Sequence, residues 1–207
     1  MIMPNLKADK VIFSILFLGF CFSWAGCGKQ ETAPAADNAE AYSALNTQRD
    51  FTLHDDNGKI FHLKDHRGQI VLLFFGYTTC PDVCPTTLSK LARVYALLGK
   101  KLRPHILTVF VTIDPRRDTP QKLKAYLKYF NINAIGLTGT KQQVDAVVHK
   151  YGASYERVES SSSALGYMFN HSDYIYLIDA HGKTSDLFHP EDTAEDMAKT
   201  IKGAYHG

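Results

Sequence analysis

The sequence predicts an α/β domain built on a mixed β-sheet with helices on both faces. Two continuous apolar runs, residues 70–77 and 105–113, are rich in β-branched and aromatic side chains, as in strands that are buried on both faces. Between them, apolar residues recur at helical spacing from Leu88 to Leu98. A buried strand, a helix and a second buried strand in this order are typical of a parallel pair with its crossover helix.

The segments on either side of this unit are expected to add a hairpin and a second helix. Residues 51–53 and 60–63 flank an Asn-Gly pair, which predicts an N-terminal β-hairpin. The first helix is expected from about residue 85 to 98, with its end near Gly99. Thr119 and Pro120 predict a second helix start, because a capping residue is followed by proline at the first helical position.

The C-terminal half is expected to complete the domain with further strands and helices. These are a short strand (134–137), a helix (141–150), a closing hairpin (174–178 and 184–188) and a last helix that starts near Pro190. Ser-rich residues 160–163 are expected in a loop. The order fits a thioredoxin-like fold whose domain spans residues 50–207.

The N-terminus has the pattern of an export signal. An apolar run of 12 residues (11–22) is shorter than the about 20 residues that a membrane-spanning helix needs. Small residues then precede Cys27, which resembles the bacterial lipoprotein signal, where this cysteine receives lipid. We expect a lipoprotein signal peptide over residues 1–26, lipid attachment at Cys27 and a flexible tether over residues 27–49. The alternative is an uncleaved signal anchor over residues 11–26. Either interpretation of the N-terminus exports the rest of the chain and leaves it beside a membrane, facing the periplasm or the outer side of the cytoplasmic membrane.

Composition excludes several classes of protein. A formal net charge of +2 gives no general basic field, so nucleic acid is not expected as a partner. Four cysteines in 207 residues are too few for a disulfide-stapled scaffold, and 45% hydrophobic residues argue against disorder.

Cys80 and Cys84 lie where the first buried strand gives way to a helix. The unpaired N–H groups and the dipole of a helix N-terminus favour thiolate over thiol. Spacing of four residues places both sulfurs on one side of a helical turn, close enough to bridge or to share an ion. The alternatives are two inert buried thiols or a structural disulfide, which would stabilise little because its loop is short. Soft sulfur ligands favour Cu(I), with an imidazole as a natural third donor.

The segment FGYTTCPDVCPTTL, residues 75–88, resembles the signature of the Sco/SenC family. The segment VTIDPRRDTP, residues 111–120, resembles a second block of the same family, and the likeness extends from about residue 51 to the final helix. The family consists of thioredoxin-fold copper proteins that assemble the binuclear copper centre of cytochrome c oxidase. The resemblance implies a mononuclear copper site, for Cu(I) or Cu(II), made by two cysteines and one distant histidine, with redox chemistry at the same sulfurs.

The resemblance singles out His171 among nine histidines as the third ligand. It is expected in a loop just before the strand at residues 174–178, as the family's histidine lies before its late strand. The family usually has an aspartate before this histidine, and the chain has Asn170. Because ligand histidines depend on outer partners, the loss of this carboxylate is expected to change the orientation or the basicity of the ring.

Asp114, at the end of the second buried strand, resembles the family's aspartate near the site. It is expected to act electrostatically from outside the ligand set on His171 or on the thiols. The alternative is a turn carboxylate beside Pro115. Arg116 and Arg117 are expected to be solvated charges.

Two main functions follow, and they differ in the role of His171. The first is a copper chaperone in which Cys80, Cys84 and His171 hold copper and pass it to subunit II of cytochrome c oxidase, with no catalytic turnover. The second is a thiol–disulfide oxidoreductase that uses Cys80 and Cys84 as a redox pair to reduce the copper-ligand cysteines of that subunit, so that His171 is dispensable. A peroxide- or redox-sensing lipoprotein is a third hypothesis. A periplasmic copper donor or thiol reductant would be a further partner.

Overall fold

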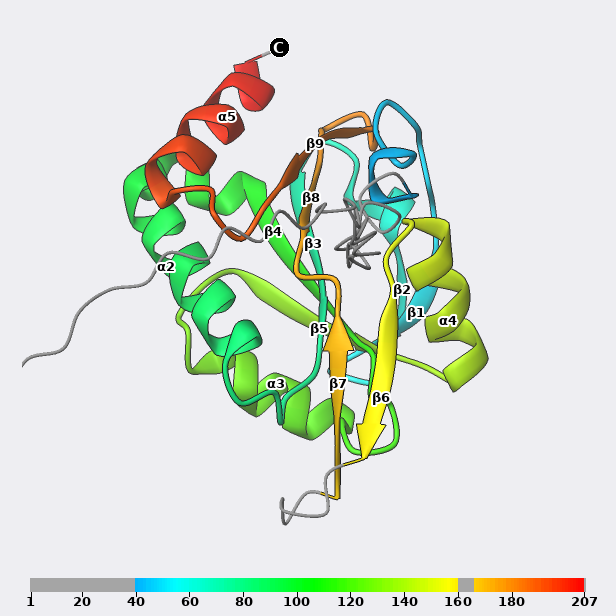
Figure 1. Cartoon of the computed structure of the whole chain (residues 1–207). Helices are drawn as coiled ribbons and strands as arrows, with labels where there is room; N and C mark the ends of the chain where they lie inside the picture. The colour runs from blue at the N-terminus through cyan, green and yellow to red at the C-terminus, as the bar shows by residue number, and fades with distance from the viewer. Residues whose placement is uncertain (1–39, 160–165, 207) are drawn as a thin grey trace, which may run out of the picture. The chain divides into compact units, whose positions relative to one another are not determined.

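The computed structural model describes residues 40–159 and 166–206 (Figure 1). The strands are β1 (Thr52–Asp55), β2 (Ile60–His62), β3 (Ile70–Gly76), β4 (Ile106–Thr112), β5 (Ala134–Thr138), β6 (Tyr155–Glu159), β7 (Tyr167–His171), β8 (Ile175–Ile178) and β9 (Thr184–Phe188). The helices are α2 (Val83–Leu102), α3 (Pro120–Lys128), α4 (Lys141–Lys150) and α5 (Ala194–His206), with the 3-10 turns η1 (Leu63–His66) and η2 (Arg103–His105). Within this part of the chain, no helix combines the length and apolar character needed to cross a bilayer.

The core is a mixed seven-stranded sheet in the order β2-β1-β5-β4-β3-β8-β9. Every residue of β3 and of β4 is buried, and the two strands run parallel from the pair Ile70–Ile106 to the pair Gly76–Thr112. β3 pairs antiparallel with β8 on its other side. The predicted β-α-β unit, the N-terminal hairpin β1–β2 and the mixed sheet are therefore confirmed.

Helices cover both faces of this sheet. Figure 1 shows α2 and α5 on the left and α4 on the right of the strands, and α2 packs against α5. α2 starts two residues before the expected position and continues past Gly99, where φ is +73° and the helix is kinked. α5 starts at Ala194 rather than near Pro190, because the Thr193 hydroxyl accepts the N–H of Asp196 (3.1 Å) and caps the helix there.

Residues 40–49 are part of the folded domain, although the sequence predicted a tether up to residue 49. Ala41 and Ala44 are fully buried, and the N–H of Asn46 donates to the Thr184 carbonyl (2.7 Å). These contacts use small side chains and main-chain groups, which leave no apolar periodicity in the sequence. The predicted signal peptide, Cys27 and the rest of the tether up to residue 39 lie outside the described residues.

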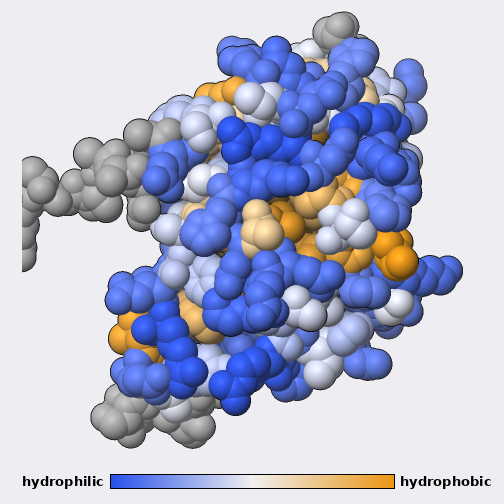
Figure 2. All heavy atoms as spheres, turned by 90° about the vertical axis from the view of Figure 1, so that its right-hand side faces the viewer, coloured by the Kyte–Doolittle hydropathy of each residue, from blue (hydrophilic) through white to orange (hydrophobic). Residues whose placement is uncertain are grey.

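A second sheet, the hairpin formed by β6 and β7, was not predicted. The two strands pair antiparallel from Tyr155–His171 to Glu159–Tyr167. The hairpin lies in front of the central sheet in Figure 1, near α4. The face of the molecule that carries α4 is mostly hydrophilic, with apolar side chains gathered in a band across its middle (Figure 2). Because β6 is largely exposed, its pattern lacks the apolar alternation that marks a half-buried strand.

Candidate metal centre

The two cysteines lie on either side of the start of α2. Cys80 ends a turn in which its N–H donates to the Tyr77 carbonyl (3.2 Å), and Cys84 is the second residue of the helix. The N–H of Cys84 points at the Cys80 sulfur, with a distance of 3.4 Å. The side chain of Asp82 makes no capping bond at this helix end. The Cys80 sulfur therefore accepts one of the helix N–H groups that a capping oxygen would otherwise take.

Cys84 occupies space that only a glycine leaves open. The Cys84 side chain is fully buried, whereas Cys80 is half-buried. A Cβ atom at Gly76, the last residue of β3, would lie 2.6 Å from the Cys84 sulfur and 2.9 Å from the Phe110 ring. The end of β3 thus has no side chain where the sulfur sits, which explains the glycine in the motif.

His171 completes the group from the hairpin. It is the last residue of β7, not part of a loop, and its Nε2 lies 3.5 Å from the Cys84 sulfur. Its Nδ1 lies 2.9 Å from the Ser172 carbonyl. Because a carbonyl oxygen only accepts, Nδ1 carries the proton and Nε2 presents its lone pair to the sulfurs. The tautomer that can bind a metal is therefore set by main chain.

Among the described residues, Asn170 forms no hydrogen bond with the His171 ring. Successive side chains of a strand point to opposite faces, so Asn170 lies on the other face of the hairpin from His171. Asn170 is also exposed. The Ser172 carbonyl contacts the ring, and the expected effect of replacing the family's aspartate on ring orientation or basicity stays a prediction.

The three donor atoms of Cys80, Cys84 and His171 lie within 4.8 Å of one another. A metal bonded at about 2.0–2.3 Å to sulfur and nitrogen separates neighbouring donors by about 3.5–4 Å, so a small adjustment would bring all three onto one ion. Two sulfurs and an imidazole form a soft donor set that favours Cu(I) and admits Cu(II). The residues fit copper in number, spacing and chemistry.

The two thiols have opposite acidities. The hydrogen bond from Cys84 lowers the pKa of Cys80 to about 3; burial opposes this shift, and the Cys84 N–H adds to it. The same hydrogen bond, together with burial, raises the pKa of Cys84 far above its ordinary value. At neutral pH the pair is a Cys80 thiolate that accepts the proton of a Cys84 thiol. Metal binding by both sulfurs therefore releases one proton.

Asp118 is a buried carboxylate that sequence reasoning missed. It is completely buried and accepts the Thr78 N–H (2.9 Å), the Thr78 hydroxyl (2.6 Å) and the Thr112 hydroxyl (2.6 Å). These bonds tie the turn that presents Cys80 to the end of β4, and the charge of Asp118 adds to the raised pKa of Cys84. The motif VTIDPRRDTP contains this aspartate four residues after Asp114, but the pattern does not mark it as buried.

Asp114 and Arg117 form an ion pair on the inner side of the hairpin. Asp114 is 2% exposed; its carboxylate pairs with Arg117 and accepts the Tyr167 hydroxyl (3.1 Å). Arg117 also donates to the Tyr167 carbonyl (3.1 Å) and stacks on the Tyr167 ring, 3.8 Å from its centroid. The prediction of a solvated Arg117 was wrong, because its guanidinium is held between a buried carboxylate and β7. The contacts of Asp114 lead to β7, and its predicted electrostatic effect on the ligands stays a prediction.

Two hollows open beside His171 and give access to the centre. One, of about 300 Å³, is lined by the Cys80 segment and by residues 168–171 of β7. The other, of about 460 Å³, is lined by residues 154–156 and 170–174. Cys80 borders the first hollow and Cys84 borders neither. A partner can therefore reach the Cys80 sulfur without disturbing the core.

Comparisons with known proteins identify relatives along most of the chain. The SCO1/SenC family model matches residues 39–206. A SCO2-like protein of Rickettsia felis is 44% identical over 154 residues, which are 74% of this chain and 75% of the relative. The structure of Bradyrhizobium japonicum ScoI with copper bound matches with a TM-score of 0.68 and 34% identity, over 78% of this chain and 99% of that chain. Yeast Sco1 with copper bound matches with a TM-score of 0.70 and 30% identity, over 79% and 90%.

These relatives confirm the expected fold and the expected family. The Sco family is one of cytochrome c oxidase assembly proteins, and several of its members have been solved with copper bound. The mixed sheet with helices on both faces is shared with those structures, as is the thioredoxin-like architecture. From the match over residues 39–206 and the identity to its relatives, the chain belongs to the SCO1/SenC family.

Proposed function

We propose that this protein binds copper through Cys80, Cys84 and His171 and delivers it to the binuclear copper centre in subunit II of cytochrome c oxidase. The observation that carries the proposal is the convergence of two sulfurs and an Nε2 lone pair within 4.8 Å, from segments 87 residues apart. Copper bound in the structures of two relatives that are at least 30% identical supports the choice of metal.

The arrangement supports transfer as well as binding. Cys80 is half-buried and borders an open hollow, whereas Cys84 is fully buried. A cysteine of the recipient can approach the copper from the side of Cys80, while Cys84 and His171 still hold it. Exchange of soft ligands one at a time avoids release of the ion into water.

The same proposal includes an exported, membrane-anchored protein. Lipid on Cys27 would hold the domain beside the membrane, on its periplasmic or outer side, through residues 28–39. Metabolic labelling with a palmitate analogue tests this part. Labelling is expected in the wild type and lost in Cys27→Ala, and equal labelling of both would contradict lipid attachment at this residue.

A copper titration of the reduced protein tests the site. Competition with a Cu(I) chelator is expected to show one bound ion per chain. The affinity is expected to fall further in His171→Ala than the about 10–100-fold that is typical when a residue that only hydrogen-bonds a ligand is removed. His149→Ala is the matched control, because His149 is an exposed histidine on α4 away from the sulfurs. Equal affinities of the wild type and His171→Ala would refute the ligand set.

A second titration tests delivery. The copper-loaded protein is mixed with the metal-free soluble domain of subunit II, and the two proteins are separated and assayed for copper. Transfer to the recipient is expected, and it should fail when the recipient's ligand cysteines are replaced by serine. Retention of copper by this protein would restrict its role to binding.

The asymmetry of the thiols favours a thiol–disulfide oxidoreductase as the second candidate function. The Cys80 thiolate would attack a disulfide of subunit II to form a mixed disulfide, and one target sulfur would leave as a thiolate. Cys84 would then lose its proton and attack Cys80, so the target gains two electrons and Cys80–Cys84 becomes a disulfide. A thiol reductant would restore the pair. Reduction of the oxidised target by His171→Ala at the wild-type rate is expected here, and a rate that falls with loss of His171 would contradict it.

A further inference from the structure

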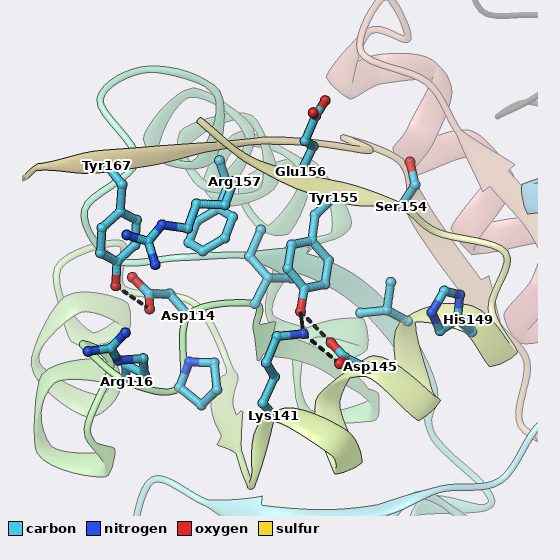
Figure 3. Close-up of a pocket in the computed structure, with 14 residues that line it drawn as sticks. Asp114, Arg116, Lys141, Asp145, His149, Ser154, Tyr155, Glu156, Arg157 and Tyr167 are labelled. Atoms are coloured by element: carbon cyan, nitrogen blue, oxygen red, sulfur yellow. Dashed lines mark hydrogen bonds and ion pairs between the residues drawn. The ribbon is translucent and has the colours of Figure 1, made fainter. Parts of the chain in front are cut away.

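Among the described strands, those of the hairpin that carries His171 do not pair with the central sheet, whose strand β3 leads to the cysteines. β6 and β7 pair with each other, and no other described strand joins them. A cavity of about 560 Å³ lies against the inner face of the hairpin and is lined by Phe169, Tyr155 and Tyr167 of that face (Figure 3). No β-ladder between described strands therefore sets the distance from His171 to Cys84, so this distance depends on side-chain contacts.

Three alternate residues of β7 face inward, and each is held by a different partner. Tyr167 stacks with Arg117, and its hydroxyl reaches Asp114, as Figure 3 shows. His171 reaches the Cys84 sulfur. Phe169, between them, is held through its main chain. Its N–H and its carbonyl both contact a single side-chain atom, the hydroxyl of Tyr77.

Tyr77 links both halves of the metal centre. Its hydroxyl accepts the Phe169 N–H (3.2 Å) and donates to the Phe169 carbonyl (3.4 Å). Its ring lies edge-on to Phe169 and His171, at centroid distances of 5.4 and 5.9 Å. Its own carbonyl accepts the Cys80 N–H (3.2 Å), and its side chain is 1% exposed. One residue thus contacts the main chain of the Cys80 turn and the main chain of β7.

We propose that Tyr77 is the positioning residue for His171, and that its hydroxyl fastens β7 so that Nε2 faces the sulfurs. The hydroxyl takes the place of a neighbouring strand, because it satisfies the N–H and the carbonyl of Phe169 as a β-ladder would. Phenylalanine at position 77 keeps the ring and its packing but leaves both main-chain groups of Phe169 without this partner. β7 then keeps its pairing with β6 and the contacts of Tyr167, but it loses the hydrogen bonds that link it to Tyr77. The role in copper binding rests on the proposed function.

The first test needs no metal. Hydrogen exchange of the reduced protein, resolved by residue with NMR, compares Tyr77→Phe with Tyr95→Phe. Tyr95 is the matched control because its buried hydroxyl bonds the Ile106 carbonyl (3.2 Å) and the Asn133 carbonyl (3.0 Å) and contacts no part of the hairpin. The Phe169 amide is expected to exchange at least tenfold faster in Tyr77→Phe and unchanged in Tyr95→Phe. Unchanged exchange of Phe169 in Tyr77→Phe would overturn the proposed fastening.

The second test asks whether the fastening acts through His171. Cu(I) affinity is measured for the wild type, Tyr77→Phe, His171→Ala and the double variant. Tyr77→Phe is expected to bind Cu(I) about tenfold more weakly than the wild type. The double variant is expected to bind Cu(I) as tightly as His171→Ala. The hyperfine lines from the His171 nitrogen in the Cu(II) EPR spectrum are expected to broaden in Tyr77→Phe and to stay unchanged in Tyr95→Phe.

The outcomes separate this inference from the proposed function. An equal loss of affinity with and without His171 would mean that Tyr77 acts on the fold in general or on the neighbouring Cys80 sulfur, and it would overturn the positioning role. Wild-type affinity and a wild-type EPR spectrum in Tyr77→Phe would overturn it as well. Failure of the wild type to bind copper would refute the proposed function, while the exchange of the Phe169 amide would still decide whether Tyr77 fastens β7.

Discussion

The cysteine half and the histidine half of the metal centre are held by different kinds of contact. Cys84 follows β3, whose main chain pairs with β4 on one side and with β8 on the other. His171 ends β7, which among the described strands pairs with β6 alone. The sulfurs therefore have the rigidity of the core, whereas the imidazole depends on a few side-chain contacts. Such a centre can give up one ligand without opening the sheet, which suits a metal that has to be passed on.

The largest contrast between the two regions is expected in global stability. Leu73 of β3 is fully buried, and Leu73→Ala is expected to lower the free energy of unfolding by about 2–5 kcal/mol, because lost burial and a cavity add up. Val158 of β6 is 38% exposed, and Val158→Ala is expected to stay within about 0.5 kcal/mol. Urea denaturation measures both variants. Similar losses would show that the hairpin is as much a part of the core as β3.

The next contrast concerns the pH dependence of the two thiols. Because the pKa of Cys80 is lowered to about 3, its thiolate fraction stays near one from pH 5 to pH 8. Alkylation of Cys80 by iodoacetamide is expected to proceed at a constant rate over this range. The rate for an ordinary thiol, with a pKa of about 8.5, would rise about tenfold with each unit increase in pH over the same range. Mass spectrometry of the alkylated peptide gives the rate at each pH.

Cys84→Ala is the control for this profile. The variant removes the hydrogen bond that lowers the pKa of Cys80 most, so the inflection of the alkylation rate is expected to move to higher pH. A wild-type rate that climbs tenfold per unit between pH 5 and pH 8 would show that Cys80 is a thiol there. The division into one thiolate and one thiol would then be wrong.

A smaller effect is expected where β3 meets the Cys84 sulfur. Gly76→Ala places a Cβ 2.6 Å from that sulfur, so we expect a loss of about 1–3 kcal/mol in the free energy of unfolding and weaker copper binding. Gly203→Ala on α5 is the matched control, since a Cβ there meets no atom within 4 Å. Copper binding is expected to be unchanged in that control. Wild-type copper affinity in Gly76→Ala would mean that the sulfur has room to move.

The smallest effect is expected at the exposed ion pair of β6. The Arg157 guanidinium lies 4.0 Å from the Tyr167 ring centroid and pairs with Glu159 (2.8 Å), and both side chains of the pair are exposed. Arg157→Ala is expected to cost no more than about 1 kcal/mol in thermal denaturation. A larger loss would mean that the hairpin depends on β6 as well as on the contacts of β7.

Where the sequence predicted structure well, the signals were local. The Asn-Gly turn, the Thr119 cap and the continuous apolar runs each act within a few residues, and all correspond to elements that the structure contains. The hairpin β6–β7 escaped notice because β6 is mostly exposed and carries charged residues. Asp118 escaped notice because its three hydrogen bonds reach Thr78 and Thr112, and a carboxylate gives no sign in the sequence of being buried.

By itself the sequence determined the central strand-helix-strand unit, the place of Cys80 and Cys84 at its turn and, through its motifs, His171 as their partner. Only the tertiary structure decided how that histidine is held. It placed Tyr77 against Phe169, 92 residues away, and directed Asp114 toward β7. It also placed the Ser172 carbonyl where it accepts the Nδ1 proton of His171. The physical reason is that main-chain hydrogen bonds and buried charges between distant segments leave no periodic pattern, whereas buried strands and helix ends do.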